Sequence, residues 1–222
     1  MADTGSVGEL AEAWRCAVRA LGGDSELAAG SGAELEHIYA SPSRSYHATG
    51  HIVQVLRDSQ ALSRECGLDS TDTATVIAAG CAHDVVYRGH AGEDERASAQ
   101  WARQALSAAG VPACSSDRVA ELVLMTIDHQ APPSDLPAAV LLDADLAVLG
   151  GEPSDYGRYL ASVRQEYRHV GEADWRSGRA AVLRALLDRE QLYLTVAGRH
   201  QWSQAARRNM QAELAALEDP DS

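Results

Sequence analysis

The feature that most restricts the fold of this chain is the helical spacing of its apolar residues. Leu10, Trp14, Val18 and Leu21 follow one another at intervals of three and four, which places them on one face of a helix. Similar spacing recurs along the chain, without strand–helix alternation or an internal repeat. The only β-like stretch, 192–196, is short and isolated. We therefore predict an all-α fold, a single-domain helical bundle.

The predicted helices are separated by short connections rich in glycine, proline and capping residues. One run, at 76–82, is apolar on every side, so its helix is expected at the centre of the bundle. We expect one domain over 1–217, with a motif core at about 35–150, C-terminal helices in 151–217 and a frayed tail at 218–222. The expected helices cover residues 10–21, 46–66, 72–87, 94–109, 115–130, 136–149, 154–170, 173–189 and 201–217.

Composition excludes several classes of protein. Apolar residues make up 45% of the chain, too many for a disordered protein. The 32 acidic residues outnumber the 19 basic ones, and a net charge of −13 argues against nucleic acid or an anionic membrane as a partner. The first residues lack a signal-peptide pattern, no apolar stretch approaches a membrane span, and the four cysteines form no C-x-x-C pair. We expect a soluble, cytoplasmic protein; an exposed apolar helix face would allow a homodimer.

Histidines and aspartates interrupt the apolar pattern at three places. His47 and His51 lie four residues apart, so on a helix their imidazoles share a face, as a polar surface pair or as part of a site. His83 and Asp84 end the most apolar predicted helix, where such residues are costly unless they are paired or bind a metal.

Two further carboxylates lie within the apolar run 138–149. Asp143 and Asp145 need a cation or strong hydrogen-bond donors if they are buried there. Positions two apart on a helix point in different directions. We therefore expect one to face the His and Asp residues and the other to cap a helix or support the site from behind.

The order His, His-Asp, Asp resembles the H…HD…D pattern of the HD-domain superfamily of metal-dependent phosphohydrolases. The surrounding blocks are similar to those of one branch of bacterial predicted HD-superfamily phosphohydrolases, and together they span roughly residues 35 to 217. These blocks are Tyr39 to Ile52, His83 to Tyr87, Glu95 to Ala99, Asp143 to Gly150, Tyr159 to Tyr167 and Ala205 to Asn209.

This resemblance implies a metal site formed by His51, His83, Asp84 and Asp145. His51 is preferred over His47 because the H-I-x-x-V run after it resembles the first HD helix, and Asp145 over Asp143 because the last ligand of the superfamily commonly follows an alanine. Two imidazoles and two carboxylates suit Mn²⁺, Mg²⁺, Co²⁺, Ni²⁺ or Fe²⁺ and leave coordination positions for water and a phosphate oxygen. The implied reaction is hydrolysis of a small phosphate ester, with a nucleotide as the first candidate, by metal-activated water.

Several neighbouring residues are expected to bind substrate or assist the reaction. Arg44 could grip phosphate or be a surface arginine, and His47 could protonate a leaving group, bind substrate or support a ligand. Tyr87 shares a helix face with His83 if that helix continues, either facing substrate or packing in the core. Asp84 and Glu95 are the expected catalytic carboxylates; Glu95 could orient the attacking water or simply stabilise the first turn of its helix. His129 ends a predicted helix and could bind substrate.

Two other functions remain compatible with these residues. An HD-type di-iron oxygenase would need more histidines between the HD pair and the last aspartate, and His90 and His129 lie there. A non-catalytic ligand-binding module would keep the metal only for stability.

Overall fold

The computed structural model describes residues 8–219, and within this range it is helical, without a β-strand. The predicted all-α bundle is confirmed, as a single domain. Its helices are α1 (Glu9–Ala20), α2 (Ala29–Tyr39), α3 (Thr49–Cys66), α4 (Ser70–Ala82), α5 (Glu93–Ala108), α6 (Ala113–Met125), α7 (Leu136–Asp145), the short 3₁₀ helix η1 (Leu146–Gly150), α8 (Pro153–Glu166), α9 (Glu172–Leu187) and α10 (Val196–Glu218).

Helix α4 forms the centre of the bundle, as its composition predicts. Every residue from Ala74 to Ala82 is buried, and α1, α3, α6 and α7 all pack against this helix. Asp69 begins α4 by accepting hydrogen bonds from the backbone amides of Thr71 and Asp72. Because α4 is surrounded, a polar side chain at its end lies in the interior of the protein.

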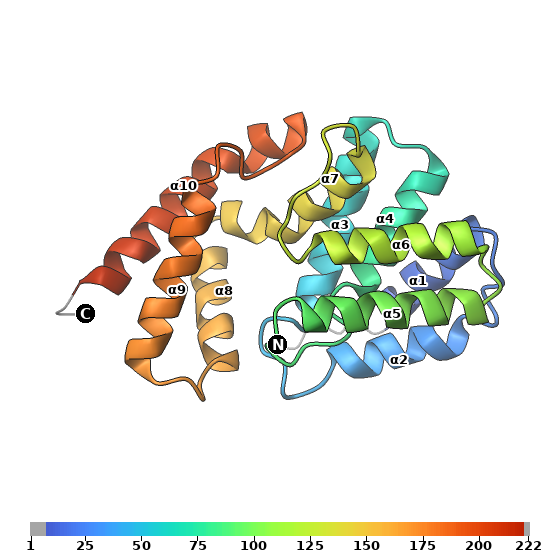
Figure 1. Cartoon of the computed structure of the whole chain (residues 1–222), viewed down its shortest axis with the longest axis horizontal. Helices are drawn as coiled ribbons and strands as arrows, with labels where there is room; N and C mark the ends of the chain where they lie inside the picture. The colour runs from blue at the N-terminus through green and yellow to red at the C-terminus, as the bar shows by residue number, and fades with distance from the viewer. Residues whose placement is uncertain (1–7, 220–222) are drawn as a thin grey trace.

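The last three helices form a separate layer beside this bundle (Figure 1). Helix α10 packs along α9 and against η1, and α8 also contacts η1. Figure 1 shows α8 and α9 as neighbouring helices on the side of the molecule away from α5 and α6. Residues at the ends of α3, α4 and α7 line a cavity together with residues of α8 and α9.

The structure corrects several predicted boundaries. Helix α2 was not predicted, because Ala29–Tyr39 begins with small residues and has little apolar periodicity. The predicted helix 72–87 ends earlier, at Ala82, and the β-like stretch 192–196 is no strand but leads into α10. Helix α6 begins after Pro112, slightly before the predicted start at 115, and Ser116 is buried in it and donates to the carbonyl of Val111.

The tail that was expected to fray, 218–222, lies largely outside the described residues. Glu218 is still part of α10 and Asp219 is its C-cap, whereas residues 220–222 lie outside the described range. None of the helices within residues 8–219 combines the length and hydropathy needed to cross a membrane.

Candidate metal centre

Three helix ends bring the predicted ligands together. His51 lies in the first turn of α3, His83 is the C-cap of α4 and Asp145 is the last residue of α7. One potential ligand atom from each lies within 4.8 Å of the other two, so these residues could hold a metal ion. The closest pairs are His51 Nε2 to Asp145 Oδ1 at 3.1 Å and His83 Nε2 to Asp145 Oδ1 at 3.4 Å.

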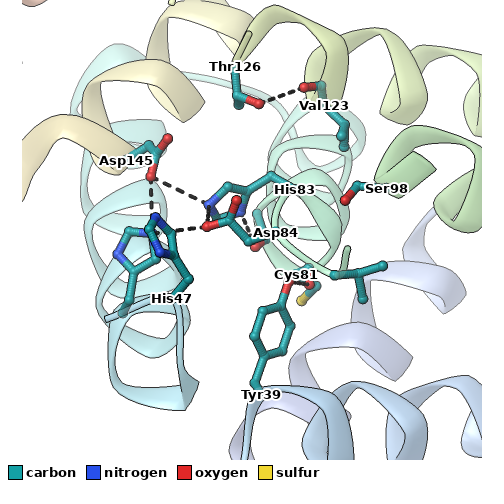
Figure 2. A network of polar contacts seen from close by, with 12 residues as sticks. Tyr39, His47, Cys81, His83, Asp84, Ser98, Val123, Thr126 and Asp145 are labelled. Carbon is teal, nitrogen blue, oxygen red and sulfur yellow. Dashed lines mark hydrogen bonds and ion pairs between the residues drawn. The ribbon is translucent and has the colours of Figure 1, made fainter. Parts of the chain in front are cut away.

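Asp84, the residue after the C-cap of α4, is the fourth member of the cluster. Its Oδ2 lies 3.1 Å from His83 Nε2 and 3.7 Å from His51 Nε2. Figure 2 shows the side chains of His83, Asp84 and Asp145 pointing toward one another, the first two from the end of α4 and the third from the end of α7. Two imidazoles and two carboxylates therefore surround one small volume, and their nitrogen and oxygen atoms suit a divalent cation of the first transition series.

The hydrogen bonding of His83 fits a metal ligand. Its Nδ1 lies 2.9 Å from the carbonyl oxygen of Gly80, which can only accept, so Nδ1 carries the proton. Its Nε2 is buried and makes no hydrogen bond within the described part of the chain. Metal-binding histidines usually hold the remote N–H on such an acceptor and present the other nitrogen to the ion. An unpartnered buried nitrogen facing two carboxylates is therefore the arrangement that a cation would satisfy.

Electrostatics of the cluster also favour a positive charge there. Burial lowers the pKa of His83, but Asp84 and Asp145 together outweigh this effect and leave it well above the usual histidine value. Burial raises the pKa of Asp145, yet His83, His129 and His51 lower it by more, to well below the usual aspartate range. Without an ion the carboxylates thus stabilise a proton on His83, and a bound cation would replace that proton.

Asp143 and Asp145 have different partners, as expected from their spacing on the helix. Asp143 points away from the histidines and accepts hydrogen bonds from Leu194 N at 2.6 Å and from Thr195 N at 2.8 Å. The hydroxyl of Thr195 donates to it as well, at 2.7 Å. Asp143 therefore anchors the start of α10, and Asp145 alone of the two faces the cluster.

His129 joins the cluster through a carboxylate. Its Nε2 lies 2.9 Å from Asp145 Oδ2, the oxygen that His51 and His83 do not contact. The backbone of His129 is left-handed, with a φ of 52°, a conformation that is uncommon for residues other than glycine. Arg189 donates hydrogen bonds to the carbonyls of His129 and Asp128 and so supports this turn. His129 thus orients Asp145; it also lines both cavities beside the cluster, so the predicted contact to substrate stays a prediction.

His47 and Tyr87 reach the site by routes that helical spacing did not predict. Helix α3 begins at Thr49, so His47 precedes it, and its ring centroid is 5.9 Å from that of His51. Tyr87 lies beyond the end of α4 and its ring stacks on His47 with centroids 3.9 Å apart. Both nevertheless line the cavity beside the cluster.

Glu95 stabilises the start of α5. Its Oε2 accepts a hydrogen bond of 2.5 Å from the backbone N–H of Gly92, which has a left-handed φ of 81°. The side chain is half-buried and also lines the cavity. The sequence offered a structural and a catalytic interpretation of this residue; the capping contact supports the first, and its position at the cavity leaves one carboxylate oxygen for the second.

Arg44 has a different role from the predicted grip on phosphate. Its guanidinium donates hydrogen bonds to the carbonyls of His47, Asp84 and Val85, at 3.0, 2.7 and 2.8 Å. It also lies over the ring of Tyr39, 5.1 Å from the centroid. Arg44 is thus committed to the backbone beneath the cluster, and it does not line the cavity.

We expect Arg44→Met to destabilise the fold without changing recognition of substrate. Removing the guanidinium leaves the carbonyls of Asp84 and Val85 without their donors, which should lower the free energy of unfolding by about 2 kcal/mol. Urea denaturation measures this loss. A large rise in KM at unchanged stability would instead restore the phosphate-binding role.

A cleft opens beside the cluster between the two layers of helices. A cavity of about 390 Å³ contains the cluster itself, and an adjoining cavity of about 610 Å³ extends between the loops after α4 and α6 and the helices α8 and α9. We call the two together the cleft. Its wider part is mainly apolar and aromatic, with Tyr87, Val163, Tyr167, Trp175 and Val182 in its walls.

Sequence reasoning did not identify two charged residues beside this cleft. Arg179 lines both cavities and donates two hydrogen bonds to Glu213, at 2.7 and 3.0 Å. Glu166 ends α8 and accepts hydrogen bonds from the segment that contains His47. Both lie in amphipathic helices, where a charged residue is ordinary, so only the folded structure distinguishes them.

The cluster could hold a metal ion, and it lies next to a cleft large enough for a small organic molecule. Such a pairing is typical of sites that position a ligand against a metal ion. No protein-family model, curated protein or solved structure matches this chain.

Proposed function

We propose that this protein is a metal-dependent phosphohydrolase that cleaves a small phosphate ester, with nucleotides as the first substrates to test. The observation that carries the proposal is the unpartnered Nε2 of His83, buried beside Asp84 and Asp145. It is supported by the sequence order His, His-Asp, Asp, which resembles the HD-domain pattern and whose members meet at one point in space.

His51, His83, Asp84 and Asp145 would hold the ion. The chemistry supplied by a divalent cation held there would be a lower pKa of the attacking water and an offset of the charge on the phosphoryl oxygens. The protein residues supply the positioning: His129 orients the Asp145 carboxylate, and the Gly80 carbonyl keeps Nε2 of His83 free to coordinate. Glu95 lines the same cavity as Asp84 and is the carboxylate available to orient the water.

The cleft indicates the kind of ester. Its aromatic and apolar wall would bind the organic group, and the guanidinium of Arg179, which lines both cavities, would favour an anionic group. Its size suits a mononucleotide or an aryl phosphate. The net charge of −13 disfavours a long polyanion.

A di-iron oxygenase is the second function compatible with this cluster. His129 favours it, because this histidine contacts Oδ2 of Asp145, whereas the other two imidazoles lie near Oδ1. His90 weighs against it: its side chain is 65% exposed and its Nδ1 lies 3.7 Å from Glu93, outside the cluster. A second ion would therefore lack the second additional histidine that the sequence offered.

Elemental analysis of protein purified without oxygen or added metal should find about one ion of manganese, cobalt, nickel or iron per chain. The same preparation should hydrolyse members of a panel of nucleotides and of aryl and alkyl phosphates. About two irons per chain, with consumption of O₂, would replace the hydrolase by the oxygenase. One ion whose chelation unfolds the protein, without turnover of any ester, would indicate a metal-stabilised binding module.

A further inference from the structure

A single carboxylate holds both the backbone and the side chain of His47. Oε1 of Glu166 accepts hydrogen bonds from the backbone amides of Ser45, Tyr46 and His47, at 2.8, 2.8 and 3.0 Å. Oε2 lies 2.7 Å from Nδ1 of His47. The Glu166 side chain is only 5% exposed. A carboxylate buried this far is stable only when its oxygens are well satisfied, so the geometry of the segment is closely fixed.

This contact determines which nitrogen of His47 is available for proton transfer in the cleft. A carboxylate only accepts, so Nδ1 of His47 carries a proton and Nε2 is the nitrogen left to exchange one. The ring cannot turn freely, because Tyr87 stacks on it at 3.9 Å and the edge of Tyr46 contacts it at 4.8 Å. The imidazole lines both cavities of the cleft.

We propose that Glu166 is a positioning residue that makes His47 the proton donor to the leaving group; this rests on the proposed phosphohydrolase function. The arrangement has the logic of a carboxylate–histidine pair, in which the acid fixes the tautomer and stabilises the imidazolium. It gives a role to Glu166 of α8, which contacts His47 although the two residues are 119 positions apart in the sequence.

Two groups that line the cleft can donate and accept the protons that hydrolysis of the ester requires. The oxygen of water forms a bond to phosphorus while the bond from phosphorus to the ester oxygen breaks. That ester oxygen takes the proton from Nε2 of His47, and the proton lost by the water passes to the carboxylate of Glu95. Exchange with solvent then returns a proton to His47 and removes one from Glu95.

The first test compares leaving groups in the metal-loaded protein. Glu166→Gln keeps the shape but replaces the acceptor at Nδ1, so kcat for phenyl phosphate, a poor leaving group, should fall by about 100-fold or more. With 2,4-dinitrophenyl phosphate, whose leaving group needs no proton, the loss should be within about threefold. His47→Gln should show the same pattern, and the double variant should lose little more than either single one.

Glu172→Gln is the matched control, because this glutamate begins α9, is 65% exposed and pairs only with Arg164 among the described residues. It should leave both rates unchanged. Equal losses for both substrates in Glu166→Gln would overturn the proposal, since a merely structural role of Glu166 affects them alike.

A second measurement does not depend on hydrolysis. Nitrogen-15 NMR of the imidazoles in Mg²⁺-loaded protein should show a protonated Nδ1 for His47 in the unaltered chain and in Glu172→Gln, and its loss in Glu166→Gln. An Nε2–H neutral tautomer in the unaltered chain would overturn the positioning role. The expected tautomer with no ester hydrolysed would instead overturn the proposed function and the proton transfer, and leave the positioning of His47 intact.

Discussion

Replacing His51 with alanine is expected to abolish metal binding and hydrolysis together. The imidazole is 5% exposed and lies 3.1 Å from Asp145 and 3.7 Å from Asp84, so no other side chain can take its place without rearranging the helix ends. Removing a direct ligand should lower metal affinity and activity by more than the loss of about 10–100-fold that is typical of residues that only support ligands. The measurements are metal content after dialysis and kcat/KM on the best ester of the panel.

His37→Ala is the control for this variant. It removes the same side chain from an exposed position of α2 that lines neither cavity of the cleft, and should leave metal content and rate unchanged. Thermal unfolding of each variant shows whether the fold is retained. Turnover that persists in metal-free His51→Ala would contradict both the site and the hydrolase assignment.

The sequence predicted the helices whose apolar residues recur regularly, and it failed where tertiary contacts decide. The stripe of Leu10, Trp14 and Val18 is fully buried in α1, as its spacing requires. Apolar character alone, by contrast, extended the predicted helix 72–87 past Ala82. Helix α4 ends there, and the Asp84 carboxylate lies next to the His83 imidazole. Tertiary packing, and not local helix propensity, sets this end of the helix.

The polar residues of the cluster were predictable for a physical reason. A histidine or aspartate in an apolar run is costly, so its presence at His83 and Asp145 signals a partner. Arg44 and Glu166 carry no such signal, because both lie among polar neighbours in the sequence. Their roles depend on which carbonyls and amides remain without partners after folding, and one sequence does not show that.

Asp143→Ala should have the largest effect on stability while leaving the metal in place. Asp143 is buried and accepts from the amides of Leu194 and Thr195 and from the Thr195 hydroxyl, which in turn accepts from Gly198 N at the start of α10. Without the carboxylate these buried donors lose a charged acceptor. We expect the free energy of unfolding to fall by about 3 kcal/mol in urea denaturation.

This variant also separates two aspartates that the sequence places only two residues apart. Folded Asp143→Ala should keep its ion, because Asp145 Oδ1 remains 3.1 Å from His51, whereas Asp145→Ala should lose it. Asp117→Ala, which removes an exposed partner of Arg103, should change stability by well under 1 kcal/mol and serves as the baseline. If Asp143→Ala lost the ion at unchanged stability, Asp143 and not Asp145 would be the ligand, because a residue that anchors α10 acts on the fold before it acts on the metal.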